Sequence, residues 1–211
     1  MNSATSDHES KASYTDPVYR EALARFHELL SEAQVCGEPE PTAMTLATTA
    51  ADGRISARIV LLKAVDERGF AFYTNYASAK AAQLAAHPNA ALCILWKTLH
   101  DVVQVRVEGT VEKVAAPESD AYFASRQRDS QIGAWASRQS QTLRDRADLE
   151  ARIAEFERRF VGSDVPRPPH WGGYRLLPDM IELWFGQRAR LHERLRYERV
   201  GGAWGKCLLQ P

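Results

Sequence analysis

The chain has 211 residues, 45% of them hydrophobic, and its 27 Lys and Arg residues are balanced by 27 Asp and Glu residues. This length fits one domain with appendages, and this apolar fraction is enough to fill a core, so global disorder is not expected. A protein that coats nucleic acid or anionic lipid normally carries a surplus of positive charge, and this composition has none.

The first segment, 1–15, is polar and lacks the apolar centre of a signal peptide. We expect a flexible tail there, followed by a single domain over 16–211. No apolar run approaches the ~20 residues of a membrane span, so the sequence predicts a cytoplasmic protein. Cys36, Cys93 and Cys207 have no metal-ligand spacing. We expect them to be buried thiols in a reducing compartment.

A helix is predicted over 16–37. Asp16 is a capping residue, Pro17 suits the first helical position, and Gly37 marks the end. One stripe of this helix is apolar, and it consists of Leu23, Phe26, Leu29, Leu30 and Ala33. This spacing is typical of a helix that packs on a core.

Strand patterns follow this helix. The stretches "AMTLATTA", "ISARIVLLKAV" and "FAFYTN" are separated by the turns "ADGR" and "DERG", which predicts consecutive hairpins. A short helix, "SAKAAQLAAH", ends at Pro88, and strands resume with "AALCILW" and "VVQVRVEGTVEKV". Long strands joined by tight turns favour an antiparallel meander. The predicted fold class is therefore α+β, mainly antiparallel β, as a barrel with flanking helices.

A second helical region is predicted from "PESDAYFASR" onward. Within it, "LEARIAEFERRF" carries an apolar stripe that should face the core, made of Leu149, Ile153, Phe156 and Phe160. "RPPHW" and "GG" predict a break before the strands "YRLLP" and "MIELWFG". "VGGAW" predicts a hairpin turn into a last strand, "AWGKCLL".

The stretch "RLHERLR" lies between these turn signals, and we predict that it is extended. Alternation along a strand would then place four basic side chains on one face: Arg190, His192, Arg194 and Arg196. Leu191 and Leu195 would face the core on the other side.

The sequence contains no GxGxxG, P-loop, GxSxG or HExxH motif, and no pair of histidines at i, i+4. Anion-binding groups recur instead. Arg58 and Lys63 flank "IVLL", Lys80 opens a helix, and "ASRQRDSQ" and "RQSQ" follow. Phosphate recognition uses such guanidinium, ammonium and hydroxyl groups. A single cluster is more often solvated surface, but several clusters indicate more than one phosphate or one large anionic ligand.

Six stretches, "RIVLLK", "FYTNYASAK", "SRQRDSQIGAWASRQS", "PRPPHWGGYRL", "IELWFG" and "RLHERLRY", resemble the pyridoxine (pyridoxamine) 5′-phosphate oxidase family in order and spacing, over roughly 40–211. The resemblance implies an FMN-binding split β-barrel and a homodimer with FMN in a cleft between the subunits. The implied activity is the oxidation of pyridoxamine or pyridoxine 5′-phosphate to pyridoxal 5′-phosphate, with O₂ reduced to H₂O₂.

Site residues are carried over from the same motifs, some of them expected from the partner subunit. The implied FMN contacts are Arg58, Ile59, Val60, Leu61, Leu62, Lys63, Tyr73, Thr74, Lys80, Gln104, Gln139, Ser140, Trp184 and Arg194. The implied substrate contacts are Lys63, Tyr122, Arg126, Ser130, Arg190, Leu191 and His192. Arg190 and His192 would approach the pyridine ring as the catalytic pair. Arg196 has no implied role, and we expect it to be exposed or salt-bridged.

The chain departs from the family pattern at Ala79, Val103 and Leu208, where Arg is usual, and it lacks the N-terminal substrate-covering motif. Two alternatives stay open: a related flavin oxidase on another ring substrate, and a non-catalytic flavin or pyridoxal phosphate carrier. A nucleic-acid-binding barrel is disfavoured by the balanced charge. We expect Trp171 and Trp204 to belong to the core.

Overall fold

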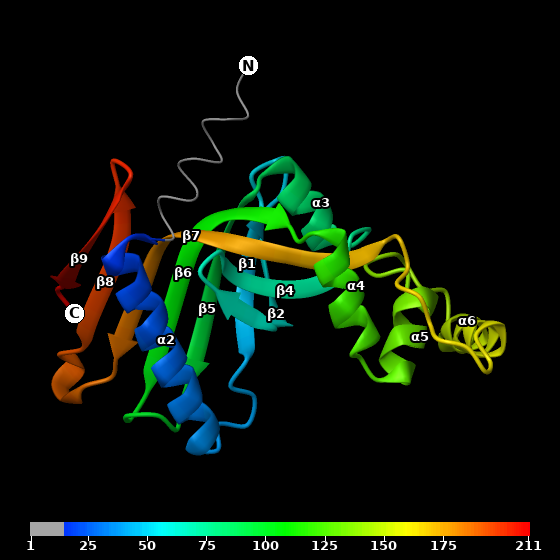
Figure 1. The fold of residues 1–211 in the computed structure, drawn as a ribbon, viewed down its shortest axis with the longest axis horizontal. Coiled ribbons are helices and arrows are strands. Elements are labelled where there is room, and N and C mark those ends of the chain that lie inside the picture. The colour runs from blue at the N-terminus through cyan, green and yellow to red at the C-terminus, as the bar shows by residue number, and fades with distance from the viewer. Residues whose placement is uncertain (1–14) are drawn as a thin grey trace.

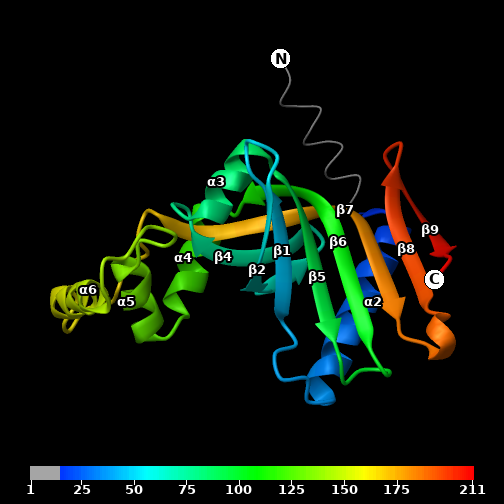
Figure 2. The ribbon, with the colours of Figure 1, turned by 180° about the vertical axis from the view of Figure 1, so that it is seen from behind.

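A computed structural model describes residues 15–211, so the tail predicted over 1–15 lies outside the described residues except for Thr15. Helix α2 (Pro17–Val35) begins as predicted, because Asp16 Oδ1 accepts hydrogen bonds from the backbone N–H groups of Val18 (2.8 Å) and Tyr19 (3.4 Å). The apolar side of α2 packs on one face of the sheet (Figures 1 and 2). That the chain from 16 onward is one domain stays a prediction.

Nine strands form one curled sheet. They are β1 (Ala43–Thr49), β2 (Ile55–Leu61), β3 (Ala64–Asp66), β4 (Gly69–Asn75), β5 (Asn89–Trp96), β6 (Val103–Lys113), β7 (Trp171–Phe185), β8 (Glu193–Val200) and β9 (Ala203–Leu209). The order is β2-β1-β5-β6-β7-β4-β3, and β8 and β9 continue from β7. Every pairing between these strands is antiparallel, which confirms the predicted class.

The predicted break before β7 is confirmed for 167–170, which belong to no strand, but it does not extend to Gly172 and Gly173, which lie inside one strand of 15 residues. A Cβ at Gly172 would lie 2.2 Å from the Tyr76 hydroxyl, and one at Gly173 would lie 2.8 Å from the Tyr73 ring. The glycines therefore let aromatic rings lie directly on the strand. One edge of β7 pairs with β6, and the other pairs first with β4 and then with β8.

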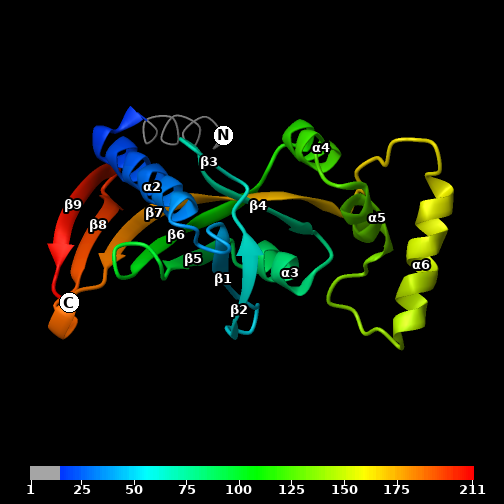
Figure 3. The ribbon, with the colours of Figure 1, turned by 90° about the horizontal axis from the view of Figure 1, so that it is seen from below.

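Helices α4 (Ala116–Ala124), α5 (Arg128–Ala136) and α6 (Arg146–Arg159) gather at the end of the sheet opposite β8 and β9 (Figures 1 and 3). They surround a second hydrophobic cluster, made of Phe123, Ile132, Phe160, Val165 and Trp171. The apolar stripe predicted over 149–160 faces this second cluster rather than the sheet. Phe160 is buried in the cluster, and Ile153 and Phe156 of α6 pack partly buried against it, although no residue of α6 itself is buried. No helix in 15–211 is long and apolar enough to cross a membrane.

The stretch "RLHERLR" is extended only in its second half. Arg188–Arg190 form a 3₁₀ turn, Ala189 and Arg190 have φ of 55° and 61°, and β8 begins at Glu193. The one-face prediction is therefore wrong for Arg190 and His192, although Arg194 and Arg196 do share a face. Leu191 is 69% exposed, so its predicted core position is also wrong.

The three cysteines are free, as predicted, but none of them is buried. Cys36 and Cys207 are exposed, and Cys93 is partly exposed on β5. The expectation of buried thiols is therefore wrong, because the strand and helix ends that carry Cys207 and Cys36 face away from the core.

Candidate active site

A cavity of about 950 Å³ lies between the sheet and the helices α4 and α5. It also borders α3 (Ala79–Ala86). Thirteen of the predicted site residues line it: Arg58, Ile59, Val60, Leu61, Lys63, Tyr73, Thr74, Lys80, Tyr122, Arg126, Ser130, Gln139 and Ser140. Of the lining residues within 15–211, four are Lys or Arg and none is acidic. The cavity is therefore strongly cationic in a chain whose formal net charge is zero.

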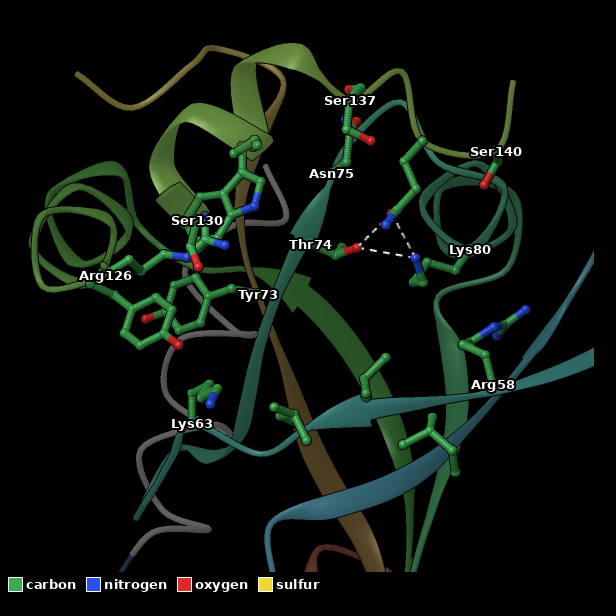
Figure 4. A pocket seen from close by; sticks show the side chains of 18 of the residues that line it. Arg58, Lys63, Tyr73, Thr74, Asn75, Lys80, Arg126, Ser130, Ser137 and Ser140 are labelled. Carbon is green, nitrogen blue, oxygen red and sulfur yellow. Dashed lines mark hydrogen bonds between the residues drawn. The ribbon is translucent and has the colours of Figure 1, made fainter. Parts of the chain in front are cut away.

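The cations occupy two sides of the cavity. Figure 4 shows Arg58, Lys80 and Ser140 on one side, and Lys63, Arg126 and Ser130 on the other. The first side comes from β2, α3 and the segment after α5. The second comes from the link after β2, from the link between α4 and α5, and from α5 itself. Two separated groups of donors suit either two anionic ligands or one long one.

Lys80 is held by neutral oxygen atoms. Its Nζ donates hydrogen bonds to Gln139 Oε1 (2.9 Å) and to Thr74 Oγ1 (3.1 Å), and Figure 4 shows the bond to Thr74. Burial lowers the pKa of the Lys80 ammonium, and the positive charge of Arg58 lowers it further. No carboxylate within 15–211 forms an ion pair with this ammonium, and its uncompensated charge favours a bound anion.

Arg58 is oriented in the same way. Its Nη1 donates to the Leu46 carbonyl (3.1 Å) and to the Thr48 hydroxyl, and its Nη2 donates to Gln83 Oε1 (3.1 Å). Burial lowers the pKa of Arg58. Thr48 and Gln83 are positioning residues that the sequence analysis missed, because β1 and α3 carry them without any motif.

Arg126, on the other side, lies between aromatic rings. Its Cζ lies 4.7 Å from the centroid of the Trp171 ring and 5.6 Å from that of Phe123. Its buried Nη1 has no hydrogen-bond partner among the described residues, and burial lowers its pKa. Trp171 belongs to the second hydrophobic cluster but also lines the cavity, so the expectation of a purely core residue is incomplete.

Ala79, where the family pattern usually has Arg, is the first residue of α3. The Ala79 side chain lines the cavity, and its backbone N–H donates to Ser140 Oγ over 3.1 Å. Ser140 has φ of 71°, a left-handed conformation that few non-glycine residues adopt. A serine hydroxyl therefore stands beside the position where the family usually has a guanidinium.

The remaining predicted residues do not line this cavity. Leu62 is buried in the main core. The others lie at the far end of the sheet or in the turn before β8, namely Gln104, Trp184, Arg190, Leu191, His192 and Arg194. Strand register places Gln104 beside Trp184 and Trp184 beside Arg194, and the His192 ring centroid lies 4.4 Å from that of Trp184. One chain thus carries two separate groups of predicted site residues.

The residues that line the cavity fit FMN and a second phosphate ester. A phosphate needs cationic and neutral N–H and O–H donors, which both sides supply, and an unpartnered guanidinium N–H is already buried there. A planar ring can lie along β2, where Ile59, Val60 and Leu61 line the cavity.

A curled antiparallel sheet with flanking helices and a cationic cavity places the chain among the split-barrel proteins. PhzG from Burkholderia lata 383, solved with tetrahydrophenazine-1-carboxylic acid, has a TM-score of 0.85 at 35% identity, covering 92% of this chain and 96% of that chain. A pyridoxamine 5′-phosphate oxidase-related, FMN binding protein from Nostoc punctiforme PCC 73102 has a TM-score of 0.67 at 18% identity, covering 86% and 95%, which is a likeness of fold alone.

Family models identify the chain more closely. The model described as pyridoxamine 5′-phosphate oxidase matches 30–160, and the pyridoxine 5′-phosphate oxidase C-terminal dimerisation region matches 171–211. The pyridoxine/pyridoxamine 5′-phosphate oxidase of Xanthomonas euvesicatoria is 57% identical over 92% of this chain and 98% of its own. The one of Myxococcus xanthus DK1622 is 53% identical over 90% and 91%. The chain belongs to the pyridoxamine 5′-phosphate oxidase family, which confirms the resemblance.

Proposed function

We propose that this protein oxidises pyridoxamine 5′-phosphate and pyridoxine 5′-phosphate to pyridoxal 5′-phosphate, with FMN as cofactor and O₂ reduced to H₂O₂. The observation that carries the proposal is the cavity lined by four cations and no described carboxylate, on a fold whose curated relatives have this name. Such a cavity selects phosphorylated ring compounds by charge.

The α3 side of the cavity would hold the FMN phosphate. Arg58 and Lys80 supply its charges there, and Ser140 supplies a hydroxyl. Thr48 and Gln83 keep the Arg58 fork in place, so little side-chain entropy is lost on binding. When bound, FMN supplies the electron acceptor for the substrate carbon, and O₂ is the final oxidant.

The α4 side would hold the substrate phosphate through Lys63, Tyr122, Arg126 and Ser130. Charge-assisted hydrogen bonds are worth about 1.5–3 kcal/mol each, so this grip fixes the reacting carbon at one place in the cavity. Fixed positive charges there also stabilise negative charge that develops on the ring. None of the residues in 15–211 that line the cavity is a carboxylate or a histidine, so this side contributes position and charge rather than a proton-transfer pair.

The second group of site residues would reach the cavity of a partner subunit. Trp184, Arg190, His192 and Arg194 all lie in the segment that matches the dimerisation region, and none lines the cavity of its own chain. A homodimer with two-fold symmetry would complete both cavities at once. Arg190 and His192 would then approach the pyridine ring from the partner.

The direct test is to purify the protein, measure bound flavin by absorbance, and assay aldehyde and peroxide release from pyridoxamine 5′-phosphate. We expect a yellow protein that forms both products in equal amounts. Bound flavin without either product would instead support the carrier alternative. The likeness to PhzG favours one more substrate, so tetrahydrophenazine-1-carboxylic acid should be assayed in parallel. Faster oxidation of that compound would replace the proposed substrate.

A further inference from the structure

Trp171 is the first residue of β7 and stands where the sheet meets the helical end of the molecule. Its side chain is buried, with 6% of the residue exposed. Its backbone carbonyl accepts a hydrogen bond from Arg167 Nη1 (2.6 Å), and Arg167 Nε is paired with Asp120 of α4 (2.6 Å). These contacts fix the indole relative to the helix that carries Tyr122.

Three rings lie nearly parallel at this place. The Tyr73 and Tyr122 centroids are 4.0 Å apart with an interplanar angle of 20°. The Trp171 centroid lies 5.6 Å from Tyr73 at 13° and 6.2 Å from Tyr122 at 8°. The guanidinium of Arg126 lies over the Trp171 ring at 4.7 Å. The three rings therefore form one stacked aromatic cluster, and the Arg126 guanidinium makes a cation–π contact with its indole.

Arg126 differs from three other buried or half-buried arginines, Arg167, Arg175 and Arg194, in how it is held. Arg175 is paired with Glu118 at 2.6 Å, Arg194 with Glu182 at 2.9 Å, and Arg167 with Asp120. No carboxylate within 15–211 forms an ion pair with Arg126. A carboxylate would occupy the N–H donors and neutralise the charge, whereas an aromatic face leaves the donors in the guanidinium plane free. The indole therefore positions the cation and keeps it available for an anion.

We propose that Trp171 is a positioning residue that presents Arg126 to the substrate phosphate, and that it thereby sets the preference for phosphorylated over unphosphorylated substrates. The inference rests on the proposed function, in which Arg126 binds that phosphate. Trp171 acts through its contact with Arg126 and not through contact with the reacting ring.

The test uses FMN-loaded protein, in which the flavin phosphate site is filled, and inorganic phosphate as the probe in calorimetric titration. Trp171→Leu should weaken phosphate binding on the order of tenfold, and Trp171→Phe, which keeps a ring, should weaken it less. In steady state, Trp171→Leu should raise KM for pyridoxamine 5′-phosphate by a similar factor and leave kcat within about twofold. FMN affinity and kcat/KM for unphosphorylated pyridoxamine should stay near wild type.

A double-mutant cycle distinguishes the positioning of Arg126 by Trp171 from a general loss of packing around the cavity. Trp171→Leu should add nothing to the loss of phosphate binding in an Arg126→Ala background. Trp135→Leu is the matched control, because Trp135 packs on Phe156 and Phe160 in the same helical end but does not line the cavity. It should lower thermal stability without changing phosphate affinity.

Unchanged phosphate binding in Trp171→Leu would overturn the inference. An equal loss in Trp135→Leu, or a further loss in the Arg126→Ala background, would overturn it as well. These results are separate from the fate of the proposed function. A protein that binds phosphate through Arg126 and Trp171 but does not oxidise pyridoxamine 5′-phosphate would refute only the proposed function.

Discussion

Arg194 Nε donates a hydrogen bond to Glu182 Oε1 over 2.9 Å, and the Glu182 side chain is 1% exposed. The other oxygen of this carboxylate faces Arg106 Nη1 at 3.4 Å and Arg196 Nη2 at 3.6 Å. One buried carboxylate on β7 thus orients three arginines on the two adjacent strands, Arg106 on β6 and Arg194 and Arg196 on β8. The ion pair between Arg196 and Glu182 confirms the expectation that Arg196 is exposed or salt-bridged.

Removing this carboxylate should destabilise the protein. Glu182→Ala leaves guanidinium groups without their buried partner, and we expect a loss of about 3–5 kcal/mol in the free energy of unfolding, measured with urea. Glu150→Ala is the matched control, because Glu150 forms an exposed pair with Arg146 at 3.2 Å on α6. That change should cost less than about 0.5 kcal/mol. Equal losses would show that Glu182 has no special role.

Lys63→Met and Arg126→Ala should weaken substrate binding more than FMN binding. Each removes one charge from the α4 side of the cavity, so we expect KM for pyridoxamine 5′-phosphate to rise on the order of tenfold or more. The Kd for FMN, from flavin fluorescence, should change much less. Arg146→Ala, which removes an exposed arginine outside the cavity, should leave both constants unchanged. If FMN binding falls as far as substrate binding, the division of the cavity into two sides is wrong.

FMN affinity should fall with rising pH because of Lys80. Burial lowers the pKa of this ammonium from its ordinary 10.5, so in the ligand-free protein its charged form costs stability at neutral pH. That cost is relieved as the pH rises through the lowered pKa. A bound phosphate favours the charged form, so the Kd for FMN should rise over the same range. Lys80→Arg, which stays charged, should flatten this rise at alkaline pH, and identical profiles would contradict the assignment.

Tyr197 should give a second pH dependence, in stability alone. Burial and its hydrogen bond to Glu21 (3.1 Å) raise the pKa of Tyr197 to about 12. A phenol whose pKa is raised by folding contributes stability that is complete below about pH 10 and is lost as the pH rises toward 12. Tyr197→Phe should cost about 1 kcal/mol at pH 8. The difference between the two proteins, from urea unfolding, should shrink above pH 10, and a constant difference would refute this account.

Two defective variants should complement each other. Arg126→Ala damages the cavity, and Arg190→Ala damages the group proposed to act on the partner. Subunit exchange between them makes mixed dimers with one doubly damaged and one intact cavity. The mixture should therefore recover up to about a quarter of wild-type activity at low substrate. No recovery after verified exchange would place Arg190 at the cavity of its own chain.

Local patterns predicted most of the fold correctly because the forces involved are local. Asp16 and Pro17 define the start of α2 through capping and a preset φ. Gly201 and Gly202, with φ of 62° and 89°, make the last hairpin turn. Predictions failed where a distant segment decides the outcome. Gly172 looked like a break, but it serves the packing of Tyr76 on a continuous strand, and the left-handed φ of Arg190 ends the expected alternation.

The motifs alone identified the family, and thirteen of the residues they propose for the site line one cavity, since residue type and spacing are visible in the chain. Which of these residues share a cavity was decided only by tertiary structure. β4 and β8 pair with opposite ends of the same edge of β7, so the residues they bring with them are held apart by the length of that strand. The exposure of Trp171 to the cavity, and its contact with Arg126, likewise depend on how α4 packs against the start of β7.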